Sequence, residues 1–390
     1  MTNVGPGIRP TLARIDLRAV THNLKQVRAA IGPRPGIVAV VKADAYGHGA
    51  VAVARILEGA GVWGFGVATV EEGVQLRRAG IRLPVLVMGA AFGDDHRTVI
   101  AHDLLPMVGD PGDIDRFAAA ARAEGCSRFT LHVKIDTGMT RLGVSEALFE
   151  EFVRRCAQYS WLRVDGLATH FYAAEEQDAQ PTLDQLAAFL RCVECARKMG
   201  AVPQWVHAAN SAASLRFAAS RFDLVRVGIL LYGAQPSRHV PAIDLKPALS
   251  WETRINAIRE VPAGTKVSYG GSFVTSRVSC IATLPVGYAD GYARALSNRA
   301  QVLVRGQRAA VIGQICMDLS MIDVTEIDGV EVGDRVTLLG GEGDDVITPV
   351  ELGRWSETIP YEVLARISWR VPREYPELEP GEVALAGCVQ

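Results

Sequence analysis

Hydrophobic and polar residues alternate in blocks from about residue 36 to residue 230. Short, almost continuously apolar runs are typical of buried parallel strands, and the segments between them have apolar residues at helical spacing. The pattern predicts eight strands, at IVAVV, FGVAT, PVLVM, LLPMV, TLHVKID, VDGLATH, QWVHAAN and LVRVGI. Eight strand–helix units in succession predict an α/β fold, a (β/α)8 TIM-type barrel. A doubly wound open sheet is the competing architecture, but GFGVAT at Gly64 lacks the third glycine of a dinucleotide fingerprint.

The pattern changes after about Pro236 to alternating apolar and polar residues with glycine-containing turns, as in SRVSCIATL and AQVLVRGQRAAVIG. This alternation predicts a mostly β C-terminal domain with antiparallel strands. One helix is expected at PVELGRWSETI, with Thr348 as its N-cap and Pro349 at its first position. We therefore expect the barrel over residues 12–240 and the β-rich domain over 241–390, which the N-terminal strand at about residues 1–16 joins.

Composition and charge narrow the class of partner. The 41 basic and 43 acidic residues nearly cancel, which gives no reason to expect nucleic acid or an anionic membrane surface. The start MTNVGPGIRP has no apolar signal-peptide core, and no apolar run is long enough to span a bilayer. Seven cysteines without framework spacing indicate reduced thiols in a cytoplasmic protein. We expect a small-molecule partner.

Polar or cationic residues follow five of the eight predicted strands. In β/α barrels, functional residues lie at the carboxyl ends of the strands and in the loops after them. The residues in question, in chain order, are Lys42, Lys134, Arg141, His170, His207, Asn210, Ser211, Arg226, Gly228 and Ile229. Their concentration at one face of the barrel predicts an active site there.

The residue types at this face indicate which chemistry to expect. The loops after strands seven and eight commonly bind phosphate in such barrels, and Asn210, Ser211 and the backbone at Gly228 can donate hydrogen bonds. Lys42 follows an apolar strand, where desolvation would lower its pKa and free its amine. A lysine and a phosphate site predict a pyridoxal phosphate enzyme. An aldolase that forms a Schiff base directly with a sugar phosphate needs much the same residues, so both remain open.

Motifs along nearly the whole chain resemble those of the bacterial alanine racemase family. The matching stretches, in the expected order, are VVKADAYGHG, HVKIDTGMTRLG, HAANSAASLRF, RVGILLYG, KVSYGGSF, PVGYADGY, ICMD and IPYEVL. The resemblance implies interconversion of L- and D-alanine, with pyridoxal 5'-phosphate as cofactor, to supply D-alanine for peptidoglycan. It implies that Lys42 holds the cofactor as an internal aldimine and is the base on the D-face of the substrate. Tyr269 would be the opposite base, supplied to the partner subunit's barrel in a homodimer.

The resemblance also assigns the residues around the cofactor. The phosphate would be held by Tyr46, Ser211, Gly228, Ile229 and Tyr361, with Asn210 close by. His170 would pack on the ring, and Arg226 would point at the pyridine nitrogen and be held by His207. Arg141 and the backbone at Met317 would bind the substrate carboxylate, and Arg141 would also contact the phenolic oxygen of the cofactor. Lys134 matches a lysine that is carbamylated in many members, and Tyr288 would narrow the entrance.

Three other functions are compatible with parts of this sequence. A racemase of another small amino acid, such as serine, would have the same residues. A pyridoxal phosphate-dependent decarboxylase of the same architecture would have an acidic residue where Arg226 stands, and a cofactor-carrying homeostasis protein would resemble the barrel alone. One departure from the family pattern is Thr140, which stands where glycine is common and is expected to shift its loop slightly.

Overall fold

The computed structural model describes residues 9–93 and 95–376. Contacts between Cα atoms divide them into two compact units. The barrel unit consists of residues 20–45 and 50–245, and the sheet unit of residues 9–19, 46–49 and 246–376. The outer parts of the expected terminal segments, residues 1–8 and 377–390, lie outside the described residues.

The barrel unit is built on a closed ring of eight parallel strands, which confirms the predicted fold class. Each strand pairs with the next one along the chain, and β10 returns to pair with β2, where Val225 is opposite Ile37. The ring consists of β2 Gly36–Val40, β3 Gly64–Val67, β4 Val85–Val87, β5 Leu105–Val108, β6 Phe129–Asp136, β8 Leu162–Ala168, β9 Trp205–His207 and β10 Leu224–Val227. All eight coincide with the predicted apolar runs.

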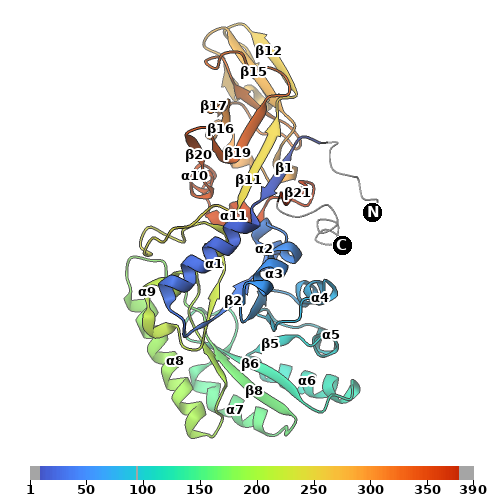
Figure 1. The fold of residues 1–390 in the computed structure, drawn as a ribbon, viewed down its shortest axis with the longest axis vertical. Coiled ribbons are helices and arrows are strands. Elements are labelled where there is room, and N and C mark those ends of the chain that lie inside the picture. The colour runs from blue at the N-terminus through green and yellow to red at the C-terminus, as the bar shows by residue number, and fades with distance from the viewer. Residues whose placement is uncertain (1–8, 94, 377–390) are drawn as a thin grey trace. The chain divides into compact units, whose positions relative to one another are not determined.

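The helix α1 precedes the first strand of the ring, and the other helices of this unit follow ring strands (Figure 1). Two of them begin at clear capping residues: Thr69 forms a capping box with Glu72, and Asp110 accepts a hydrogen bond from Gly112 N before Pro111 opens the next helix. The helices are α1 Leu17–Ile31, α2 Lys42–Gly47, α3 Ala50–Gly59, α4 Val70–Arg78, α5 Asp95–Ala101, α6 Pro111–Ala123, α7 Phe149–Ala157, α8 Gln180–Lys198 and α9 Ser211–Arg216.

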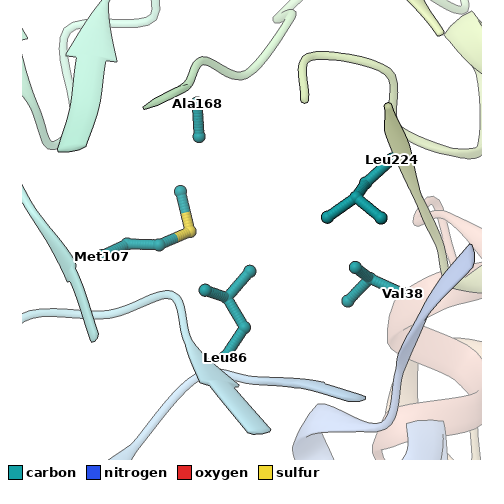
Figure 2. Packing of buried hydrophobic residues seen from close by; sticks show 5 residues of the cluster. All are labelled: Val38, Leu86, Met107, Ala168 and Leu224. Carbon is teal, nitrogen blue, oxygen red and sulfur yellow. The ribbon is translucent and has the colours of Figure 1, made fainter. Parts of the chain in front are cut away.

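Side chains fill the interior of the ring. Figure 2 shows the cluster of Val38, Leu86, Met107, Ala168 and Leu224, which come from five different strands and point toward one another. These side chains form one apolar layer inside the ring.

The sheet unit contains a ten-stranded sheet with the order β12-β15-β18-β17-β16-β19-β11-β1-β21, to which β20 adds by pairing with β19. Its neighbours are antiparallel except for β1 and β21, as the sequence alternation predicts. The strands are β1 Leu12–Ile15, β11 Leu249–Arg254, β12 Ala257–Val261, β15 Ser279–Leu284, β16 Gln301–Val304, β17 Gln307–Val311, β18 Ser320–Asp323, β19 Arg335–Glu342, β20 Asp345–Ile347 and β21 Arg373–Glu374.

Smaller elements complete the sheet unit. The strands β13 Lys266–Val267 and β14 Phe273–Val274 form a hairpin. The predicted helix is present as α10 Pro349–Trp355, with the Thr348 hydroxyl accepting from Glu351 N at 3.1 Å, and α11 Pro360–Ala365 follows it. Among the described residues, the longest apolar helices fall short of what crossing a bilayer requires.

Candidate active site

Lys42 is the first residue of α2, two positions after β2 ends at Val40. Burial is the main cause that lowers the pKa of its amine, and the Arg141 cation lowers it further, while Glu72 opposes both. Within the described part of the chain, its Nζ has no hydrogen bond or ion pair. Lys42 therefore offers a free and partly desolvated amine just after the end of a strand.

The backbone after Lys42 is left-handed. Ala43, Asp44, Ala45 and Tyr46 have φ angles between 50° and 55°, and Gly47 follows at 81°. L-residues in this region cost about 1–2 kcal/mol each, so the segment must be held by its surroundings.

Two carboxylates hold this left-handed segment. Glu72 Oε1 accepts from Ala43 N at 2.6 Å, and Asp44 Oδ1 accepts from Ala50 N at 2.7 Å. The other oxygen of Glu72 accepts from Ala68 N at 2.7 Å and from Thr69 N at 3.2 Å, and the bond from Thr69 is part of the capping box of α4. One carboxylate therefore fixes both the start of α4 and the backbone next to Lys42.

Arg226 is buried on β10 and donates hydrogen bonds in several directions. Its Nη1 donates to His207 Nδ1 at 2.7 Å, and its Nη2 donates to Thr169 O at 2.6 Å and Ala208 O at 2.9 Å. His170 Nδ1 lies 3.3 Å from Nη2. Burial lowers the pKa of Arg226 to about 10, so the guanidinium remains a cation at neutral pH.

The two histidines predicted for this site are neutral acceptors. Burial, and then the charge of Arg226, lower the pKa of His170 and of His207 well below the ordinary value. His207 also contacts His132, whose Nδ1 lies 2.8 Å from His207 Nε2. We missed His132 in the sequence, although it stands two residues before Lys134 and so shares a face of β6 with it.

The predicted donor cluster lies where β9 and β10 lead into helical turns. Asn210 Oδ1 caps α9 by accepting from Ala213 N at 3.0 Å, and Ser211 Oγ accepts from Gly228 N at 2.9 Å. Ile229 opens the 3-10 helix Ile229–Tyr232. The first N–H groups of a helix have no partner within it, so both turns present donors suited to an anion.

A second lysine lies in a small pocket, whose lining is Lys134, Ile135, Asp136, Met139, Arg141, Leu142 and His170. Lys134 is 7% exposed, and burial followed by the charges of Arg226 and Arg141 lowers its pKa to about 8. In the described residues it forms no ion pair with Asp136. Asp136 instead accepts hydrogen bonds from Gly138 N and Thr140 N, both at 3.0 Å, and so shapes the loop that carries Arg141.

Thr140 has a φ angle of 54°, in the left-handed region that favours glycine, the residue that the resemblance implied at this position. A β-branched residue is strained there.

We expect Thr140→Gly to stabilise the protein by roughly 0.5–1 kcal/mol, because relief of strain exceeds the added entropy of the unfolded chain. Urea denaturation measures the change. In the control Thr98→Gly, inside the helix α5, the same substitution should destabilise; equal effects at both positions would contradict the prediction.

Three further predicted residues lie in the sheet unit. Tyr269 is 73% exposed in a turn between Ser268 and Gly270, which both have positive φ angles. Tyr288 N donates to Cys316 O at 3.1 Å, and Ala289 N donates to Met317 O at 3.0 Å. The turn at Tyr288 and the segment at Met317 are therefore tied together through their backbones.

Asp290 fixes that turn through its carboxylate and was missed in the sequence. It is fully buried, and both of its carboxylate oxygens pair with the guanidinium of Arg9 at 2.5 and 2.6 Å. Oδ2 also accepts from Gly287 N at 3.0 Å. A side chain at Gly287 would place its Cβ 2.3 Å from Cys316 O, so glycine is required for the close approach.

Tyr46 and Tyr361, both predicted to contact the phosphate, lie side by side in the sheet unit. Their ring centroids are 6.1 Å apart and the rings are tilted by 47°. Burial raises the pKa of the Tyr46 phenol, so it remains a neutral hydroxyl at neutral pH.

The residues of the barrel unit fit pyridoxal 5'-phosphate. Lys42 offers a free amine for the aldehyde, the donors at Ser211 and Ile229 suit a phosphate, and the Arg226 cation with neutral His170 suits an aromatic nitrogen heterocycle.

Two family models match the chain almost end to end. Residues 15–236 match the N-terminal domain of alanine racemase, and residues 248–375 match its C-terminal domain. Among curated relatives, the alanine racemase of Halothermothrix orenii is 45% identical over 94% of this chain and 97% of its own. That of Sorangium cellulosum is 44% identical over 95% of this chain and 100% of its own.

Solved structures agree with these matches. Alanine racemase from Bacillus anthracis with bound L-Ala-P superposes with a TM-score of 0.90 at 35% identity, covering 97% of each chain. Alanine racemase from Bartonella henselae with covalently bound pyridoxal phosphate superposes with a TM-score of 0.83 at 29% identity, covering 94% of this chain and 99% of the other.

Proposed function

Because the chain belongs to the alanine racemase family, it is a pyridoxal 5'-phosphate-dependent racemase, and we propose that it interconverts L- and D-alanine with Lys42 and Tyr269 as the two bases. Racemisation removes the α-proton from one face and returns a proton to the other, so one base per face is required. The observation that supports this most is the free Lys42 amine, whose pKa is lowered by burial and by Arg141.

The side chains of this protein supply proton transfer and orientation. When bound, the cofactor supplies an electron sink for the negative charge left on the α-carbon. Lys42 Nζ takes or returns the α-proton on the D-face, and the Tyr269 hydroxyl does so on the L-face. Arg141 and the backbone at Met317 bind the substrate carboxylate, which orients the Cα–H bond toward the bases.

The remaining proposed contacts hold the cofactor. Its phosphate would be bound by the hydroxyls and backbone donors of Tyr46, Ser211, Gly228, Ile229 and Tyr361, with Asn210 close by. His170 would pack on the ring, and Arg226, held by His207, would face the pyridine nitrogen. Tyr288 would narrow the entrance. The contacts of Ser211 with Gly228 and of Arg226 with His207 and His170 support this arrangement.

Arg226 should determine which reaction follows loss of the α-proton. A permanent cation at the pyridine nitrogen disfavours protonation there and weakens the electron sink, which limits transamination. In Arg226→Glu we expect more alanine to transfer its amino group to the cofactor, which would end in its amine form, and to leave as pyruvate. Pyruvate released per D-alanine formed, measured enzymatically, tests this; an unchanged ratio would contradict it.

Lys134 is proposed to be carbamylated. With a pKa of about 8, roughly a tenth of its amine is neutral at pH 7, far more than for an ordinary lysine. The neutral Nζ attacks carbon dioxide, a C–N bond forms, and one proton is lost, which leaves an anion beside Arg141. Protein equilibrated with ¹³C-bicarbonate should show a carbamate ¹³C resonance that is absent from Lys134→Gln. The same spectrum for both proteins would exclude the modification.

The assembly and role follow from the family. We propose a cytoplasmic homodimer in which each barrel receives Tyr269 from the partner, and which supplies D-alanine for peptidoglycan. We also propose domains at residues 12–240 and 241–390, joined by the strand near the N-terminus. The matched models, which end at residue 236 and resume at residue 248, support that division.

A substrate panel tests the proposed function directly. Purified protein is incubated with the L-isomers of alanine, serine and other small amino acids, and the products are separated by chiral chromatography. D-alanine should form fastest. A faster conversion of serine would identify a serine racemase, amine and carbon dioxide would identify a decarboxylase, and bound cofactor without turnover would identify a carrier.

A further inference from the structure

His132 lies inside the barrel and extends the contact between Arg226 and His207 by one hydrogen bond that none of the proposed roles uses. It is 0% exposed on β6, and its Nδ1 lies 2.8 Å from His207 Nε2. His207 Nδ1 in turn lies 2.7 Å from Arg226 Nη1. The row therefore runs from Arg226 through His207 to His132.

The position of the His207 proton in this row follows from Arg226. A guanidinium can only donate, so His207 Nδ1 must be an unprotonated acceptor. Burial and the charge of Arg226 hold the pKa of His207 well below its ordinary value and lower that of His132 to about 3, so both rings are neutral. The single proton of His207 is then on Nε2 and is donated to His132 Nδ1.

The surrounding barrel is shaped to admit the His132 ring. A side chain at Gly166, on the neighbouring strand β8, would place its Cβ 2.5 Å from Cγ and Nδ1 of His132. The pairing of β6 with β8 also shifts register between Leu131 and His132. A glycine and a β-bulge at one residue indicate that the ring is positioned for a specific contact.

We propose that His132 is a positioning residue that fixes the tautomer of His207 and thereby the placement of Arg226. If His207 carried its proton on Nδ1, that N–H would face the Nη1–H of Arg226. Two donors cannot form a hydrogen bond, so the guanidinium would lose one of its acceptors. Without the His132 acceptor, the buried Nε2–H of His207 would have no partner within this row, so its preferred tautomer would be penalised. The consequence for the cofactor rests on the proposed function, whereas the hydrogen-bond order does not.

The hydrogen-bond order can be measured in the loaded enzyme by ¹⁵N NMR of histidine-labelled protein. The His207 resonances are identified by their loss in His207→Gln. We expect an unprotonated Nδ1 and a protonated Nε2, with the Nε2 resonance changed in His132→Phe. A protonated Nδ1 at His207, or no effect of His132→Phe on its resonances, would overturn the proposal.

The consequence for the reaction is measured as pyruvate released per D-alanine formed. His132→Phe fills the space without an acceptor, and we expect this ratio to rise roughly tenfold, in the range found when outer partners of site residues are removed. In His132→Gln the amide oxygen can still accept, so a smaller rise is expected.

A control separates this role from packing alone. His96→Gln changes another buried histidine, which pairs with Asp113, and should leave the ratio unchanged. Equal ratios in His132→Phe and the parent would overturn the positioning role. If Arg226→Glu also left the ratio unchanged, the proposed role of Arg226 at the cofactor would fail, and the NMR result alone would decide on His132. Should His132→Phe not fold, His132→Gln and the parent spectrum serve instead.

Discussion

Lys42→Ala is expected to lose essentially all racemisation of alanine, with kcat lowered by at least about 10³-fold. The change removes both the amine that binds the cofactor and one of the two bases, and a single general base alone contributes roughly 10²–10⁴-fold. Chiral chromatography of D-alanine formed from L-alanine measures the loss. Retention of more than a few per cent of the parent rate would contradict the proposed role.

Two controls separate the amine from its charge. Lys42→Arg keeps a cation in place but offers no amine with a lowered pKa, so it should be as inactive as Lys42→Ala. Lys198→Ala removes an exposed lysine that lies 3.8 Å from Glu194 on α8 and should leave the rate unchanged.

The same variant can test the shared active site. If each barrel needs Tyr269 from its partner, Lys42→Ala dimers and Tyr269→Ala dimers should both be inactive. In a hybrid dimer, the Lys42→Ala subunit supplies an intact Tyr269 to the barrel of the Tyr269→Ala subunit, which has an intact Lys42. One of the two sites of the hybrid therefore has both residues. Random mixing should therefore restore about a quarter of the parent sites. If mixing and subunit exchange restore nothing, the two bases do not come from different subunits.

Asp290→Ala is expected to lower the free energy of unfolding by about 2–3 kcal/mol. The substitution removes a fully buried carboxylate that accepts two charge-assisted hydrogen bonds from the partly buried Arg9 guanidinium, and loss of hydrogen bonds to a charged group costs about that much. The backbone N–H of Gly287 loses its acceptor as well. Urea denaturation measures the loss.

An exposed ion pair provides the comparison. Arg154 and Glu150 pair on the surface of α7, and Glu150→Ala should change stability by less than about 1 kcal/mol. A loss at Asp290 as small as that at Glu150 would show that the buried pair does not hold the turn. A destabilised turn should also raise KM, because Tyr288 and Met317 are tied to it.

The barrel could be predicted from sequence because its strands are short apolar runs whose order along the chain is also their order in space. The site face could be predicted for the same reason, since residues just after those runs, such as Lys42 and Ser211, must meet at one end. The left-handed backbone from Ala43 to Tyr46 could not be predicted from the sequence. Glycine favours positive φ, but the only glycine here, Gly47, follows the segment.

Pairings between residues that are distant in the sequence also could not be predicted. His132 and His207 are 75 residues apart, and Arg9 and Asp290 are 281 residues apart. Each of these residues is ordinary in its local segment, and only the tertiary fold selects its partner. In the structure, Gly166 leaves room for the His132 ring. From the sequence alone, the same glycine could equally have indicated a β-bulge or a weak position in a strand.

The place of β1 in the sheet sets the order in which this protein can mature on the ribosome. Arg14 of β1 donates a hydrogen bond to Glu252, 238 residues later, and the other edge of β1 pairs with β21 at Arg373. At synthesis rates of roughly 5–20 residues per second, β1 stays unpaired for about 10–50 s after it is made. Ribosome-bound chains that end between residues 228 and 249 contain all eight barrel strands but not β11, and they should therefore present this four-residue strand to chaperones and proteases.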